Sequence, residues 1–281
     1  DTSAAASSML AGRMRMVMDT SYHRGQVWFM VGGMNETIRT QLAHRTIREF
    51  TGEPIPEETM QTLFDVAVRT STSRGFQQSV FIRVKDQAKR DELARIANQP
   101  YIARAPELLV GVLDVRRGIR ILEELDQPTQ GAANMVVFRE AFTDTVLMIQ
   151  NVSVAAETLG LGVSHLGSVL NDYAAAIEVL ELPKYTFPVL GMILGYPNQE
   201  PQLKPRMDKS LRVHTDVYQE PESWTETLKD YDDEMHTYYD LRDANRRVDQ
   251  FTTQIARKFI EDFNERSPIP HIKAQGFDLE S

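Results

Sequence analysis

The sequence contains no cysteine, no long apolar run and no excess of basic residues, and each absence removes a class of function. Without cysteine, the chain forms no disulfide and offers neither a thiolate nucleophile nor a zinc–thiolate site. No apolar run approaches the ~20 residues that a membrane-spanning helix needs. The net charge of −9 argues against a general nucleic-acid binder, which requires a basic face. We therefore expect a soluble protein with a cytoplasmic location.

Several catalytic and cofactor-binding motifs are also missing. None of the 6 histidines forms a pair at the helical spacing of a metal site, so no metal centre is predicted. Gly160, Gly162 and Gly167 have the wrong spacing for a dinucleotide-binding fingerprint and follow a predicted helix. The sequence also lacks a P-loop and a Gly-x-Ser-x-Gly elbow. Composition alone leaves a Ser-His-Asp triad open, although no motif points to one.

The first 33 residues differ from the rest of the chain. Residues 1–33 are rich in Ala, Ser and Met and show no sustained apolar period. We expect Met34 to be the natural start and the preceding residues to be either non-native or a poorly ordered extension; the alternative is a helix packed on the body. Residues 34–281 are expected to form a single domain, with a charged, helical C-terminal part from about residue 222.

Apolar periodicity within residues 34–281 predicts an α+β domain. Helices are predicted at 35–46, 56–67, 87–97, 136–159, 172–181, 223–239 and 251–263, and strands at 79–84, 107–115, 163–167 and 187–194. Residues 117–134 contain Gly118, Pro128 and Gly131, show little pattern and are predicted to be a mobile segment or a small excursion over the active face. The helix at 136–159 is apolar on more than one side, through Phe142, Val146, Ile149, Val152, Ala156 and Leu159. Such a helix is buried inside a domain or in a subunit interface.

Residues 44–51 carry the strongest chemical signal, with the sequence His-Arg-Thr-Ile-Arg-Glu-Phe-Thr. In a helix, Arg45 and Arg48 would share one face and bind one anion together. The planar guanidinium suits phosphate, because its donors match two oxygens at once. A second cationic pair, Lys204 and Arg206, lies far downstream and would close on the same anion. The alternative is that these residues are ordinary surface charges.

Two further segments are candidates for ligand contacts. Residues 70–75, which we call the hydroxyl loop, are either a solvated turn or a source of donors to a flat polar ligand. Residues 242–247 form a basic patch between two predicted helices of an acidic chain, or else a simple solvated turn.

In their order and intervals, these segments resemble the FMN-dependent nitroreductase family, and most closely its NADPH-preferring, oxygen-insensitive branch with flavin reductase relatives. The resemblance extends from about Met34 to at least Arg247, and it rests on residues 44–51, 156–162, 187–197 and 203–206. It implies an α+β fold with a central mixed β-sheet flanked by helices, a long buried helix and a helical C-terminal extension. It also implies a homodimer with FMN sites at the interface.

The resemblance also implies roles for individual residues. The FMN phosphate and ribityl chain would be held by His44, Arg45, Thr46 and Arg48, and the phosphate clamp would be completed by Lys204 and Arg206. Around the flavin ring would lie Thr72, Gln99, His165, Leu166, Gly167 and Ser168, with Gln99 on the pyrimidine edge. The acceptor pocket would include Ser73 and Arg74, and the NADPH 2′-phosphate would be bound by Arg242, Arg246 and Arg247. Gly167 lacks a Cβ atom, which allows close approach of backbone and ring.

The sequence departs from the family pattern at a few positions. Arg74 interrupts what is often a longer serine run, His165 stands where an aromatic hydroxyl can occur, and Ser168 where a second glycine is common. Leu170 takes a position that can hold an arginine. These differences leave FMN binding in place but bear on the choice of substrate and of nicotinamide cofactor.

The resulting functional hypothesis is an FMN-dependent NADPH oxidoreductase without a catalytic side chain of its own. It would reduce nitroaromatics, quinones or similar electron-poor acceptors by two-electron transfer in two alternating half-reactions, with the redox chemistry supplied by FMN. A rival enzyme hypothesis is an NADPH:FMN flavin reductase that releases reduced flavin. Two non-enzyme hypotheses also stay open, namely a flavin-binding protein without turnover and a domain with no cofactor.

Overall fold

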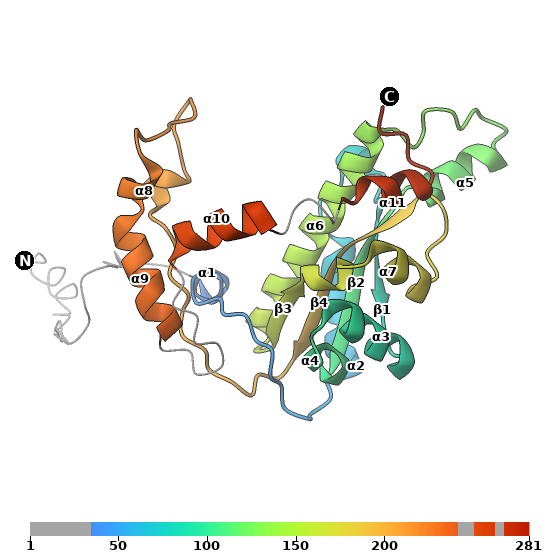
Figure 1. Ribbon diagram of the computed structural model, residues 1–281. Coiled ribbons are helices and arrows are strands. Elements are labelled where there is room, and N and C mark those ends of the chain that lie inside the picture. Colours follow the sequence, from blue (N-terminus) through green and yellow to red (C-terminus); the bar gives the residue numbers. More distant parts are fainter. Residues whose placement is uncertain (1–34, 241–249, 262–266, 281) are drawn as a thin grey trace, which may run out of the picture. The chain divides into compact units, whose positions relative to one another are not determined.

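A four-stranded sheet with helices on both faces forms the centre of the structure, a computed structural model that describes residues 35–240, 250–261 and 267–280 (Figure 1). Contacts group the chain into two units that meet between Met34 and Asn35, and the described residues all belong to the second unit. The prediction that residues 1–33 are non-native or poorly ordered falls on residues outside the described ranges. The helices are α1 (Glu36–Leu42), α2 (Glu57–Val68), α3 (Gln87–Ala97), α4 (Tyr101–Arg104), α5 (Arg116–Glu124), α6 (Met135–Thr158), α7 (Tyr173–Val179), α8 (Trp224–Thr227), α9 (Lys229–Asp240), α10 (Phe251–Glu261) and α11 (Ile269–Ala274). Three short 3₁₀ turns are η1 (Ser73–Gly75), η2 (Gly167–Leu170) and η3 (Lys209–Leu211).

The strands are β1 (Ser79–Arg83), β2 (Glu107–Asp114), β3 (Gly162–Leu166) and β4 (Thr186–Gly195), in the order β1-β2-β4-β3. All three strand pairs are antiparallel. The predicted α+β class is confirmed, but the prediction of a mixed sheet is wrong for the described strands. Parallel pairing among the described residues is limited to isolated bridges, such as Thr46 with Val163.

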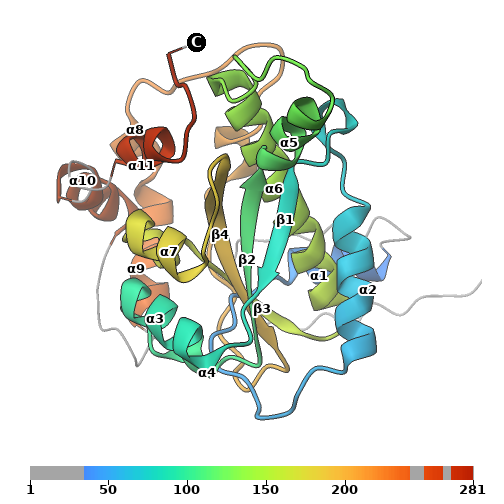
Figure 2. The same cartoon turned by 90° about the vertical axis from the view of Figure 1, so that its right-hand side faces the viewer.

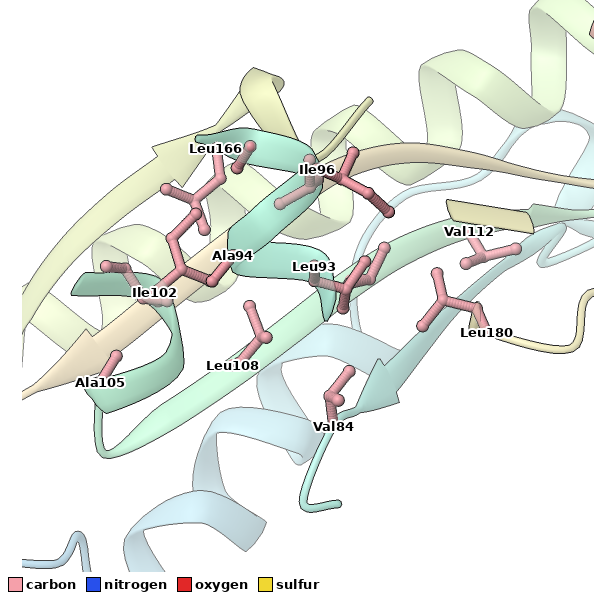
Figure 3. Close-up of a cluster of buried hydrophobic side chains, with 14 residues drawn as sticks. Val84, Leu93, Ala94, Ile96, Ile102, Ala105, Leu108, Val112, Leu166 and Leu180 are labelled. Carbon is pink, nitrogen blue, oxygen red and sulfur yellow. The ribbon is translucent and has the colours of Figure 1, made fainter. Parts of the chain in front are cut away.

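Two layers of helices cover the sheet. Helices α2 and α6 pack together on one face, while α3, α7 and η2 pack on the other (Figure 2). Helix α6 lies very close to β2 at Gly111, where a Cβ atom would come within 2.4 Å of the Ile149 Cδ1 atom. On the opposite face, Leu93 and Ile96 of α3 pack in one buried cluster with Leu108 and Val112 of β2 (Figure 3). The central strands β2 and β4 are therefore buried on both faces, as their continuous apolar sequence requires.

Two predicted boundaries are wrong. Helix α1 ends at Leu42 instead of residue 46, because the following residues pair with β3. The predicted connection at 117–134 contains helix α5. Gly118 suggested a break, but it lies inside this helix, which begins where the Arg117 amide donates to the Asp114 carboxylate and which buries Ile119.

Within one chain, the predicted apolar face of α6 is only partly buried, and the alternative of burial in a subunit interface stays a prediction. Ile149, Val152 and Ala156 are buried as predicted, but Phe142, Val146 and Leu159 have 41%, 39% and 48% of their surface exposed. Besides apolar residues, the inward face of α6 buries polar ones, among them Asp144 and Thr145. Burying polar side chains requires hydrogen-bond partners. The Oδ1 atom of Asp144 accepts two hydrogen bonds from the hydroxyl loop, while its buried Oδ2 atom has no partner among the described residues. The Thr145 hydroxyl donates to the carbonyl of Ala141.

Among the described residues from Ser223 onward, most lie in helices α8, α9, α10 and α11, as predicted. The helix predicted at 223–239 is divided into α8 and α9, and the Ser223 hydroxyl caps its start by accepting from the Glu226 amide at 3.3 Å. Within the described ranges, none of the helices combines the length and the apolar character needed to cross a bilayer.

Candidate functional site

Residues 44–51 form an extended segment that lies between two other parts of the chain. On one side, the Ile47 amide donates to the carbonyl of Val163 in β3 at 2.9 Å. On the other side, a single oxygen of the Gln199 side chain accepts from the amides of Arg48 and Glu49, at 2.8 and 2.7 Å. The predicted helical placement of the two arginines is therefore wrong. The hydrogen bonds to Val163 and Gln199 fix the backbone that carries Arg45 and Arg48.

The cationic residues predicted from opposite ends of the chain line one pocket of about 120 Å³. Its walls are His44, Arg45, Thr46, Arg48, Pro201, Gln202, Lys204, Arg206 and Tyr238. Lys204 and Arg206 come from the irregular segment after β4 and lie two residues apart, so that in an extended chain they project to the same side. The structure thus brings together all six residues predicted to bind the phosphate and ribityl chain.

Within the part of the chain that the structure describes, the positive charge of this pocket is not compensated by carboxylates. Among the described residues, no carboxylate forms an ion pair with Arg45, Arg48, Lys204 or Arg206. The Nε atom of Arg45 is buried and has no hydrogen-bond partner. Four like charges at one pocket repel one another, and a buried donor without a partner is costly. Both features favour a bound anion.

A histidine and a glutamate connect this pocket to the end of α6. The Nδ1 atom of His44 lies 2.5 Å from Glu157, whose side chain is 12% exposed. His165 on β3 is close to both residues. Burial, with a smaller contribution from His44, lowers the pKa of the His165 imidazole below its ordinary value of 6.5, and Glu157 acts in the opposite direction. His165 is therefore neutral near pH 7, and its Nε2 atom is buried without a partner.

A second group of polar residues lies where β3 ends. The hydroxyls of Tyr101 and Ser168 both donate to the Oε1 atom of Gln99, each at 2.8 Å. This contact joins the chain after α3 to the turn η2. Gly167 is exposed, and a Cβ atom on it would meet nothing within 4 Å, so that the space beside its backbone is open. The side chain of Leu166 points away into the core (Figure 3).

The hydroxyl loop contacts a different part of α6 from the one that carries Glu157. The amide and hydroxyl of Ser73 donate to Asp144 at 2.8 and 2.9 Å, and Arg74 pairs with Glu140 at 2.9 Å. Asp144 precedes Glu157 by 13 residues, which corresponds to about 20 Å along a helix at 1.5 Å per residue. The structure therefore does not bring the predicted ring and acceptor residues Thr72, Ser73 and Arg74 to the cationic pocket of the same chain.

The predicted and the observed site residues do not coincide fully. Arg242, Arg246 and Arg247 lie outside the described residues. Gln199 and Tyr101 were not predicted, since their roles arise from single hydrogen bonds between distant segments that leave no sequence pattern. Glu157 was present in the segment 156–162 that carried the resemblance, but its contact with His44 was not predicted.

Two protein-family models together match most of the chain. The model of the nitroreductase family matches residues 42–196, and the model of the nitroreductase family C-terminal domain matches residues 204–280. The two matches divide the chain just after β4, and the second begins at Lys204. The cationic pocket is therefore built from residues of both matched regions.

Individual relatives extend over almost their whole length. The NADPH-flavin oxidoreductase of Vibrio harveyi is 35% identical over 246 residues, covering 86% of this chain and 98% of the relative. The oxygen-insensitive NADPH nitroreductase of Salmonella typhimurium is 34% identical over 245 residues, covering 87% of this chain and 99% of the relative. The crystal structure of nitroreductase A from Vibrio parahaemolyticus superimposes with a TM-score of 0.79 at 32% identity, covering 87% and 99% of the two chains. The predicted resemblance is confirmed: the chain belongs to the nitroreductase family.

Proposed function

We propose that the chain is an FMN-dependent oxidoreductase that takes electrons from NADPH and passes them in pairs to electron-poor acceptors such as nitroaromatics and quinones. The names of its relatives support an NADPH-dependent oxidoreductase that acts with flavin. The observation on this chain that carries the proposal is the pocket with four cationic side chains and no described carboxylate to balance them. A phosphate monoester, with a charge between −1 and −2 near neutral pH, is an anion of the size and charge that such a pocket accepts.

The described residues fit FMN at both ends of the molecule. The buried Nε donor of Arg45 has no protein partner, as expected where a phosphate oxygen completes the set. From Val163, which pairs with Thr46, β3 leads to Gly167 and Ser168, no more than about 17 Å along an extended chain. The space beside the exposed Gly167 is open to a flat ring. A ligand with a charged end and a planar end would therefore lie along β3.

Each side chain would make a limited contribution. Arg45, Arg48 and the pair Lys204–Arg206 would bind the phosphate, and His44, held by Glu157, would contact the ribityl side. The bound FMN supplies the electron transfer, so that no side chain need act as a nucleophile or a general acid. The protein fixes the position of the cofactor and places positive charge and N–H donors where they favour added negative charge.

We also propose a homodimer, as the resemblance implied. Phe142, Val146 and Leu147 are exposed on α6 although they are apolar, and such patches are typical of interaction surfaces. With flavin sites at the interface, the hydroxyl loop of one chain would be able to serve the site of the other. The measured mass in solution would test this proposal.

Three assignments remain predictions. Arg242, Arg246 and Arg247 would bind the NADPH 2′-phosphate, Arg74 and Ser73 would line the acceptor pocket, and the protein would be cytoplasmic. A flavin reductase that releases reduced FMN is the second candidate, favoured by the name of the Vibrio harveyi relative.

A spectroscopic experiment tests the proposal and separates it from its rivals. The purified protein is reconstituted with FMN, freed of excess flavin and mixed with NADPH without oxygen. We expect a yellow protein whose 450-nm band, a general property of oxidised flavin, disappears on mixing and returns when a nitroaromatic is added. A protein that stays colourless after reconstitution contradicts FMN binding, and a yellow protein that NADPH does not bleach contradicts the enzyme. Faster turnover with free FMN than with a nitroaromatic would favour the flavin reductase.

A further inference from the structure

The amide of Gln99 is held in one orientation by two hydroxyl groups from different elements. The Tyr101 hydroxyl, at the start of α4, and the Ser168 hydroxyl, in η2, both donate to the Oε1 atom at 2.8 Å. A carbonyl oxygen has two lone pairs, and these two donors use both. The amide is therefore fixed at its oxygen end.

At the other end of the amide, the Nε2 atom carries two N–H donors. Among the described residues, the Nε2 atom of Gln99 has no hydrogen-bond partner, and it does not belong to the buried atoms that lack one. It therefore remains accessible, with two N–H groups in a fixed direction. The adjacent backbone at Gly167 is exposed and has open space beside it. A pair of directed donors next to an open surface suits a flat ligand with acceptor atoms at its edge.

We propose that Ser168 and Tyr101 are positioning residues that hold the Gln99 amide with its N–H groups toward the flavin ring. This inference rests on the proposed function. The pyrimidine edge of a flavin carries two carbonyl oxygens and, once reduced, an added negative charge near one of them. Fixed N–H donors interact more strongly with that charge than with the neutral ring, so that they favour the reduced flavin. Fixing the amide in advance also removes the entropy that a free side chain loses on binding.

Ser168 is the informative member of this arrangement. The family resemblance places a second glycine at this position, and a glycine would leave Tyr101 as the single donor to Gln99. In this chain the hydroxyl of Ser168 reaches back to a residue 69 positions earlier. The turn η2 is thereby tied to the end of α3, and the two hydrogen bonds to the Oε1 atom hold the amide in this orientation.

The test uses the FMN-loaded full chain and measures the reduction potential of the bound flavin. The variants are Ser168→Ala, Tyr101→Phe, the two combined, Gln99→Met, and Gln99→Met combined with each hydroxyl deletion. Gln99→Met removes the amide but keeps a side chain of similar length. We expect each single hydroxyl deletion to reduce the preference for reduced over oxidised flavin about threefold, and both together about tenfold. Because a tenfold change corresponds to about 30 mV for a two-electron couple, the potential should fall by about 15 mV and 30 mV.

The combined variants decide whether the hydroxyls act through the amide. In the Gln99→Met background, Ser168→Ala and Tyr101→Phe should cause no further change in potential or in FMN affinity. Equal effects with and without the amide, or unchanged potentials in the single variants, would overturn the inference. Tyr218→Phe is the control, since Tyr218 is 74% exposed and lies outside these contacts. If the unaltered protein fails to bind FMN the proposed function falls, whereas normal bleaching with unresponsive variants removes the positioning role alone.

Discussion

The cationic pocket makes a quantitative prediction about FMN affinity. Arg48 is half-buried in the pocket, and replacing it with alanine removes hydrogen bonds to a charged group, which are worth about 1.5–3 kcal/mol. Since each 1.4 kcal/mol is a factor of ten, FMN should bind roughly 10- to 150-fold more weakly. Lys204 is exposed, so that solvent screening reduces its contribution to about 0.2–1 kcal/mol. Lys204→Ala should therefore weaken FMN binding by no more than about fivefold.

Riboflavin provides the matched ligand, because it has the ring and ribityl chain of FMN but no phosphate. Its affinity should be the same in the unaltered protein and in both variants. Arg212→Ala is the matched protein control, since Arg212 is exposed and does not line the pocket. Fluorescence quenching of the flavin gives both dissociation constants. Added salt should weaken FMN binding to the unaltered protein more than binding to Arg48→Ala, because screening acts on the lost charge.

Two results would refute the assignment of this pocket to the phosphate. One is an FMN affinity that stays the same in both variants. The other is a parallel loss of FMN and riboflavin affinity, which would mean that the substitutions disturb the ring site or the fold and not a phosphate contact.

Four other features of the fold predict changes in stability. Gly162→Ala would place a Cβ atom 2.7 Å from Ile47, and this overpacking should lower the free energy of unfolding by about 1–3 kcal/mol. Gly118→Ala has open space around the new Cβ atom and should stabilise α5 by about 0.5–1 kcal/mol. Urea unfolding measures both changes. Asp144→Ala leaves two donors of the hydroxyl loop unpaired and should cost about 2–4 kcal/mol, with faster amide exchange in that loop; unchanged exchange would contradict this role. Because the pKa of His165 is lowered in the folded chain, the unfolded chain takes up the proton first, so stability should fall as pH drops below about 6.5. His165→Gln should show a smaller fall between about pH 7 and about pH 5, and an identical pH profile would exclude this origin.

Local signals in the sequence were sufficient for most of the fold. Period and length identified α3 and β2 with nearly their observed bounds, because a buried strand and an amphipathic helix leave strong patterns. Gly118 misled the prediction of α5, since a single glycine lowers helix propensity by only about 1 kcal/mol and neighbouring residues outweigh it. The interface alternative for α6 stays a prediction, but the burial of Asp144 on its inward face was not predictable, because a carboxylate is placed inside only when tertiary donors reach it.

The candidate site was predictable in its residue types but not in its geometry. The cationic character of residues 44–48 and 204–206 was visible in the sequence, and these segments do meet in one pocket. Their backbone conformation was not visible, because the segment 44–51 takes its shape from partners on β3 and in the loop after β4. The two hydroxyl donors to Gln99 were equally hidden, since neither Tyr101 nor Ser168 carries a pattern that indicates its acceptor.

The double hydrogen bond to Gln199 has a consequence for how a ligand leaves. One amide oxygen joins two stretches of chain that are 151 positions apart, and each stretch brings part of the positive charge. Withdrawal of the irregular stretch after β4 would break both bonds and would separate Arg48 from Lys204 in the same motion. A ligand that binds only the closed pocket would therefore raise the free energy needed to open this stretch, and at saturation that free energy would increase with the logarithm of the ligand concentration.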